Sequence, residues 1–121
     1  LHDVLADGDA RALRGTLSRE LADAGVATDQ AEAMVLAASE VAVNAERHGA
    51  GLRTLRVGGG DGTFVCEVSD AGGGLDDPLA GYLPPGAPTS AGGGLWVARQ
   101  LTRRLDLVAS PGGGLTVRLW T

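Results

Sequence analysis

Residues 28–48, "TDQAEAMVLAASEVAVNAERH", predict a long helix that restricts the folds open to this chain. When the segment is projected at about 100° per residue, its apolar side chains gather on one face centred near Ala38. These residues are Ala31, Met34, Val35, Ala38, Val41, Ala42 and Ala45. Leu36 and Val43 lie on the opposite side, so the helix is apolar nearly all round. A helix of this kind is usually covered on more than one face.

Four polar residues interrupt the far side of this helix: Glu40, Asn44, Arg47 and His48. Two interpretations are open from the pattern alone. They form a solvated face, or they form a functional stripe whose partner is a ligand or a metal ion, because polar groups among apolar neighbours need partners.

The remaining elements complete an α-α-β-β-loop-α-β-β order. A helix is predicted at 9–24, with Leu13, Leu17 and Leu21 at i, i+4 and i+8, and another at 94–104. Strands 52–57 and 63–69 are joined by "GGGDG", and "LDLVAS" and "LTVRLW" form a second hairpin across "PGGG". Hairpins imply an antiparallel or mixed sheet. We therefore predict one domain over 1–121, a two-layer α/β sandwich with its helices on one face of the sheet.

Composition excludes several classes of protein. All ten basic residues are Arg, so the Lys that a Walker A loop or a protein-kinase-like fold requires is missing. The net charge of −5, without a basic stripe, argues against direct nucleic-acid binding. No apolar run reaches 18 residues, so no membrane span is expected. The N-terminus lacks the basic region and the apolar stretch of a signal peptide, and it has no initiator Met. We therefore interpret the chain as a trimmed or excised domain.

The single cysteine, Cys66, lies in the strand-like run "TFVCEVSD". We expect it to be a small buried hydrophobic side chain rather than a catalytic thiol. One cysteine supports no disulfide framework, which suits a reducing cytoplasm.

Two glycine triplets, 72–74 and 92–94, bracket a stretch without periodicity. The first follows a strand that ends at Asp70, and the second leads directly into a helix. Free amides at a helix start make an anion site, and a stretch of this length is usually a lid or a binding loop. The outer triplets, 58–60 and 112–114, are assigned to turns and to no function.

Together these motifs resemble the GHKL (Bergerat) ATP-binding fold of histidine kinases, Hsp90-type chaperones and gyrase-type ATPases, over residues 8–120. "ASEVAVNAERHG" is similar to the N box of the anti-sigma-factor kinase branch, "VSDAGGGLDDPLAG" to the G1 box, and "GGGLWVARQLTRRLDLVASPGGGLTVRL" to the G2 box. "GLWVARQL" resembles in particular ATPase domains fused behind a MEDS-type sensory domain.

The resemblance implies roles for the polar helix residues and for Asp70. Asn44 would coordinate the Mg²⁺ that bridges the phosphates of ATP. Glu40 would be the general base, Arg47 would hold phosphate, and His48 would pack or hydrogen-bond locally. Asp70 would accept a hydrogen bond from the exocyclic amine of adenine.

The resemblance also assigns the inner glycines and the segment between them. Residues 71–93 would form the ATP lid. Gly72 and Gly74 would let the purine approach the backbone, while Gly92, Gly94 and the helix starting near Leu95 would face the phosphates.

The closing motif departs from the family, because Leu115 stands where a Thr is usual. Thr116 is the candidate substitute for the adenine-side hydroxyl, although strand alternation points neighbouring side chains to opposite faces. Residues 71–98 contain no basic residue, so weak ATP binding is expected.

The resemblance implies a cytoplasmic serine/threonine kinase that binds ATP and Mg²⁺ and acts with a sigma factor or an anti-anti-sigma (STAS-type) partner. Two alternatives stay open: a non-catalytic switch module, and the ATP-binding half of a sensor histidine kinase. The first helix is expected to pack on the sheet, and a homodimer interface, as in some relatives, is the alternative for it.

Overall fold

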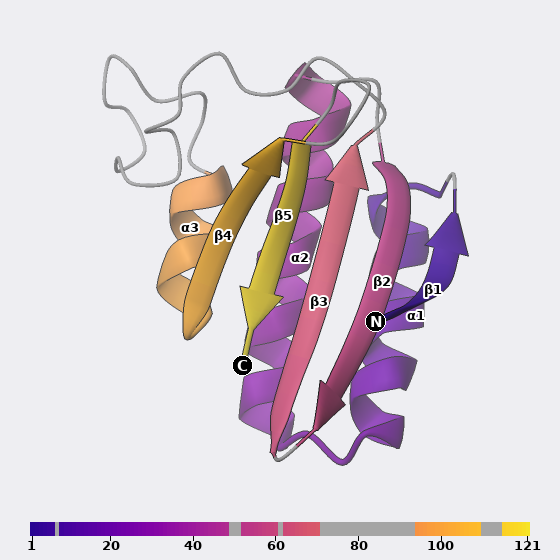
Figure 1. Ribbon diagram of the computed structural model, residues 1–121, viewed down its shortest axis with the longest axis vertical. Helices are drawn as coiled ribbons and strands as arrows, with labels where there is room; N and C mark the ends of the chain where they lie inside the picture. Colours follow the sequence, from indigo (N-terminus) through magenta and orange to yellow (C-terminus); the bar gives the residue numbers. More distant parts are fainter. Residues whose placement is uncertain (7, 49–51, 61, 71–93, 110–114) are drawn as a thin grey trace.

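The computed structural model describes residues 1–6, 8–48, 52–60, 62–70, 94–109 and 115–121. Their order along the chain is β1 (His2–Ala6), α1 (Ala10–Asp23), α2 (Thr28–His48), β2 (Leu52–Gly60), β3 (Thr63–Asp70), α3 (Gly94–Leu101), β4 (Arg104–Ala109) and β5 (Leu115–Trp120). The five strands form one sheet in the order β1-β2-β3-β5-β4, and every pair of neighbours is antiparallel. Figure 1 shows α1 and α2 behind the sheet, with α3 beside β4. The predicted two-layer α/β sandwich is confirmed.

Local signals explain where α1 and α2 begin and end. Asp9 caps α1, because its side chain accepts a hydrogen bond of 2.8 Å from the amide of Ala12. The turn that follows α1 uses Gly25 at a φ of 74°, a conformation that glycine adopts without strain. The chain then enters α2, whose bounds match the predicted helix at both ends.

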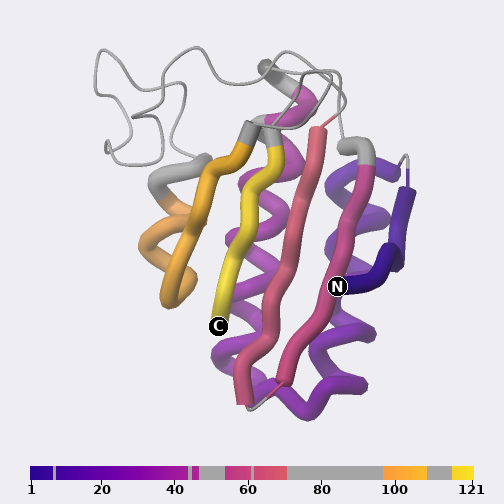
Figure 2. The backbone as a smooth tube through the Cα atoms, viewed as in Figure 1, coloured from indigo at the N-terminus to yellow at the C-terminus, as the bar shows by residue number. Residues whose placement is uncertain are grey.

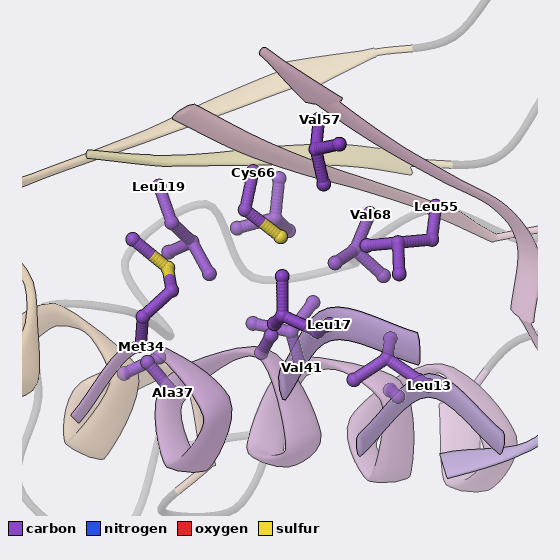
Figure 3. Packing of buried hydrophobic residues seen from close by; sticks show 14 of the residues in the cluster. Leu13, Leu17, Met34, Ala37, Val41, Leu55, Val57, Cys66, Val68 and Leu119 are labelled. Atoms are coloured by element: carbon purple, nitrogen blue, oxygen red, sulfur yellow. The ribbon is translucent and has the colours of Figure 1, made fainter. Parts of the chain in front are cut away.

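The core fills the space between the sheet and α1 and α2. Leu13, Leu17 and Leu21 of α1 are fully buried, as their spacing predicts. In Figure 3, side chains from α1 and α2 point toward those of β2, β3 and β5. The residues labelled there are Leu13, Leu17, Met34, Ala37, Val41, Leu55, Val57, Cys66, Val68 and Leu119. The core is therefore mainly aliphatic. The longest helices lie against it, and no helix among the described residues is long and apolar enough to cross a membrane.

Cys66 lies within this core with none of its surface exposed, as predicted. Burial, with a smaller contribution from the neighbouring Glu67 carboxylate, raises the pKa of the Cys66 thiol to about 12. The thiol therefore stays protonated at neutral pH and behaves as a small apolar group.

Three features differ from the sequence prediction. Residues 2–6 form β1, an edge strand that the prediction lacked, paired with β2. Gly58, Gly59 and Gly60 belong to β2 rather than to the turn, and they pair with β3. Helix α3 ends at Leu101 rather than at 104, because the amide of Arg103 donates to the carbonyl of Trp120 and starts the pairing of β4 with β5.

A row of charges crosses the sheet on the face away from α1 and α2. The registers align one charged residue from each strand, with alternating sign, in the order Asp3, Arg56, Glu67, Arg118 and Asp106. The central carboxylate of Glu67 is buried, although no described helix covers this face. Arg56 lies 3.3 Å from its Oε1 and Arg118 lies 2.7 Å from its Oε2. The two arginines thus shield Glu67 from water.

Candidate functional site

The elements that carry the predicted site residues meet at one end of the domain. Figure 1 shows the C-terminal end of α2, the end of β3 and the start of α3 toward the same end of the molecule, and Figure 2 shows the end of β3 there as well. α2 also packs against α3. The fold therefore brings the N-box helix, the strand that ends at Asp70 and the helix opened by Gly94 to a common edge.

Asp70 is the last residue of β3, and only 8% of its surface is exposed. Phe64, Cys66 and Val68 alternate with outward-facing residues along this strand and are buried in the core. Asp70 continues that alternation, so it shares the helix-facing side of the sheet. A shielded carboxylate at the end of a strand is suited to accept a hydrogen bond from a ligand amine, because little bulk water competes for it.

The strand beside Asp70 is irregular. Leu52 pairs with Asp70 and Thr54 pairs with Ser69, so β2 holds one extra residue, Arg53, at this point. Such bulges re-aim the backbone and are frequent beside functional sites. The periodicity of the sequence did not predict this bulge.

Glu40 lies in α2 one turn before Asn44, and its side chain is half-buried. Among the described residues, the carboxylate of Glu40 makes no hydrogen bond or ion pair that would occupy it. The backbone of Asn44, Arg47 and His48 belongs to the last turns of α2. The side chains of these three residues lie outside the described part of the structure, so their roles stay predictions.

The glycine motifs are described only where they enter α3. Gly94 and Leu95 form its first turn, as the predicted phosphate-facing role requires, but the Leu95 side chain lies outside the description. Gly72, Gly74 and Gly92, and the predicted lid 71–93, fall outside the described residues.

Thr116 lies on β5 opposite the residue that precedes Asp70 on β3. Thr116 pairs with Ser69, and their hydroxyl oxygens lie 3.0 Å apart. Arg118, two residues further along β5, contacts Glu67 on the face away from α1 and α2. By alternation Thr116 shares that face, whereas Asp70 lies on the other. The role of Thr116 as the adenine-side hydroxyl stays a prediction, and the alternation of β5 turns its side chain to the face away from Asp70.

Sequence reasoning missed one neighbour of the candidate base. Ser39, the residue before Glu40, is buried and accepts a hydrogen bond of 2.9 Å from Nη1 of Arg14. The contact joins α1 to α2 across 25 positions of sequence, so no local pattern could have indicated it.

Comparison with known proteins agrees with this arrangement. The family model of the histidine kinase-like ATPase domain matches residues 5–120, nearly the whole chain. The chain belongs to the histidine kinase-like ATPase family, of the GHKL type, whose domains are ATP-binding, kinase-like ATPases. No curated protein gives a significant match to the chain.

The residues present fit ATP. Asp70 offers a shielded acceptor for a purine amine, and the start of α3 offers backbone amides for phosphate. Among the described residues no three His, Cys, Asp or Glu side chains form a metal cluster. The Asn44 side chain, the magnesium ligand that the sequence predicts, lies outside the description, so this role stays a prediction.

Proposed function

We propose that this domain is an anti-sigma-type serine/threonine protein kinase. It binds ATP with Mg²⁺ and phosphorylates a Ser of an anti-anti-sigma (STAS-type) partner, and it holds or releases a sigma factor according to the state of that partner. The observation that carries the proposal is Glu40, a half-buried carboxylate without a described partner, one turn before Asn44 on the N-box helix.

Each residue has a chemical task in this proposal. When bound, ATP supplies the phosphoryl group that is transferred. Glu40 accepts the proton of the attacking hydroxyl at a carboxylate oxygen, and its partial burial limits competition by water. Asp70 positions the adenine. Few further groups are needed, because positioning and electrostatics do most of the work in phosphoryl transfer.

Calorimetry with ATP and Mg²⁺ tests the nucleotide part of the proposal. Asp70→Asn keeps the size of the side chain but replaces one acceptor oxygen by a donor, so we expect at least about a tenfold weaker binding of ATP. Asp106→Asn is the matched control on the opposite face of the sheet and should bind as the wild type does. Equal affinities of wild type and Asp70→Asn would refute the assignment of Asp70.

Phosphate transfer from radiolabelled ATP to a panel of STAS-domain proteins tests the catalytic part. Glu40→Gln should retain ATP affinity and lose transfer by about 10²-fold or more, the usual contribution of a general base. Undiminished transfer by Glu40→Gln would remove Glu40 from the mechanism.

A non-catalytic switch module is the second candidate, and the position of Thr116 favours it. The alternation of β5 turns Thr116 to the face away from Asp70, so Thr116 would not supply the adenine-side hydroxyl usual in the family. Intact partner binding without detectable transfer by the wild type would select this function.

A further inference from the structure

Two side-chain hydrogen bonds fasten α1 to α2 on either side of the candidate base. The amide of Ala10, the first residue of α1, donates to Oε1 of Glu46 at 3.1 Å. Four residues further along α1, Nη1 of Arg14 donates to the hydroxyl of Ser39 at 2.9 Å. The two helices therefore run antiparallel, and the N-terminal half of α1 lies against the C-terminal half of α2.

These contacts bracket the turn of α2 that carries the predicted site residues. Ser39 directly precedes Glu40, and Glu46 follows Asn44 by two positions. Because seven residues make about two turns, Ser39 and Glu46 share one face of α2, the face toward α1. Positions 40 and 44 are about one turn apart, on a stripe about 100–140° further round the helix. A rotation of this part of α2 would therefore redirect both positions.

The apolar packing of this part of α2 gives little resistance to such a rotation. Between residues 37 and 45, the buried apolar side chains are Ala37, Ala38, Val41, Ala42 and Ala45. Alanine lets helices approach closely, but its short side chain forms a shallow ridge that interlocks less than a larger one. The two hydrogen bonds lie about 10 Å apart along the axis of α2, so together they hold both its rotation and its position along that axis.

Glu46 and Asp9 satisfy different amides at the start of α1. The first amides of a helix have no partner within it, and a carboxylate suits the positive end of the helix dipole. Asp9 accepts from the amide of Ala12, and Glu46 accepts from the amide of Ala10. The bond of Asp9 closes within α1 and its cap, whereas the bond of Glu46 joins α1 to α2. Capping of α1 and attachment of α2 can therefore be removed separately.

We propose that Glu46 is a positioning residue of the ATP site, which together with the Arg14–Ser39 bond fixes the turn of α2 that presents Glu40 and Asn44. Glu46 acts through α2 and not through contact with the nucleotide. This inference rests on the function proposed for Glu40 and Asn44, but the hold of α1 on α2 is measured without nucleotide.

The first test measures amide hydrogen exchange of residues 40–46 in the domain without nucleotide. Exchange is compared with that of β3 in the same variant, which corrects for a change in overall stability. Glu46→Ala removes the acceptor, so amides 40–46 should exchange faster by about tenfold or more. Glu46→Gln keeps an acceptor oxygen and should exchange nearly as the wild type does.

Asp9→Ala is the matched control, because it removes the other carboxylate from the start of α1 and leaves both bonds to α2 in place. It should speed exchange at the start of α1 alone. Ser39→Ala removes only a hydroxyl and should act on residues 40–46 in the same direction as Glu46→Ala. The proposal is overturned if amides 40–46 exchange equally in Glu46→Ala and wild type, or equally in Glu46→Ala and Asp9→Ala.

The second test adds ATP and Mg²⁺, with circular dichroism to check that each variant is folded. Glu46→Ala should weaken ATP binding by about threefold to tenfold and lower kcat for phosphate transfer, and Glu46→Gln should restore both to within about twofold. Asp9→Ala should leave both unchanged. A loss that Glu46→Gln does not relieve, or that Asp9→Ala reproduces, contradicts a positioning role.

The two tests separate this inference from the proposed function. If the wild type binds no ATP, the proposed function fails, and hydrogen exchange alone decides whether Glu46 holds α2. If ATP binds and transfer occurs, but exchange of residues 40–46 does not respond to Glu46→Ala, the positioning role fails and the proposed function stands.

Discussion

Arg118 and Glu67 form a two-pronged ion pair on the uncovered face of the sheet: Nε and Nη2 of Arg118 donate to Oε2 of Glu67 at 2.9 and 2.7 Å. The carboxylate is buried and the guanidinium is partly exposed. Removing the exposed partner leaves a shielded charge with only Arg56 to compensate it, at 3.3 Å.

We expect Arg118→Ala to lower the free energy of unfolding by about 2 kcal/mol, because buried hydrogen bonds to charged groups are costly to break. Arg104→Ala, which breaks the more exposed pair with Asp106, should cost under about 1 kcal/mol. Urea denaturation of both variants measures the difference. Equal losses would show that Glu67 is adequately solvated without Arg118.

Burial of Cys66 predicts the direction in which the stability of the domain changes with pH. Its pKa is raised from 9.0 to about 12, chiefly by burial. Below pH 9.0 both the folded and the unfolded chain keep the proton, so the thiol has no effect on stability. Between these two values the unfolded chain loses the proton and the folded chain keeps it. Stability should therefore fall as pH rises, by up to about 1.4 kcal/mol per unit.

Cys66→Ala is the control for this titration. Above pH 9.0, the free energy of unfolding of Cys66→Ala should lack the decrease with pH that Cys66 causes, whatever the stability of this variant at neutral pH. A thiol reagent at pH 8 should modify wild-type Cys66 only on unfolding. Identical slopes for the two proteins would contradict the assignment.

The glycines at the end of β2 allow a matched comparison. A Cβ added to Gly59 would clash with the backbone carbonyl oxygen of Thr63, whereas one added to Gly60 meets nothing within 4 Å. Gly59→Ala should destabilise the domain by roughly 1–3 kcal/mol, as overpacking does. Gly60→Ala should change stability by less than about 1 kcal/mol, because its backbone has no positive φ. Thermal denaturation of Gly59→Ala and Gly60→Ala measures the difference in stability between the two variants.

Removing magnesium should abolish most ATP binding. Residues 71–98 contain no basic residue, so the triphosphate charge would be balanced by Mg²⁺, backbone amides and Arg47. Titrating ATP with and without EDTA measures the effect, and Arg47→Ala in the presence of Mg²⁺ measures the share of Arg47. Tight binding that survives EDTA would contradict the weak, magnesium-dependent site expected here.

Much of the fold could be predicted because its signals are local. Leu13, Leu17 and Leu21 recur at i, i+4 spacing on α1, and α2 carries apolar residues nearly all round. Both helices therefore indicated a sheet that covers their apolar faces. β1 escaped prediction because "HDVLA" is a short edge strand with little alternation, stabilised by pairing with β2 rather than by its own pattern.

The site was predictable only in part. Motif order placed Glu40 on α2 and Asp70 at the end of β3, and the structure has them there. The contact between Arg14 and Ser39, the bulge opposite Asp70 and the charge row depend on how distant segments align, which no local pattern encodes.

The alternation of β3 ties the nucleotide recognition proposed for Asp70 to the hydrophobic interior. Cys66, Val68 and Asp70 occupy every second position, so a one-residue insertion before Asp70 would turn its carboxylate toward solvent. The same insertion further upstream would also expel Cys66 and Val68 from the core. The position of the proposed purine-reading group is consequently fixed by the same alternation that fills the core.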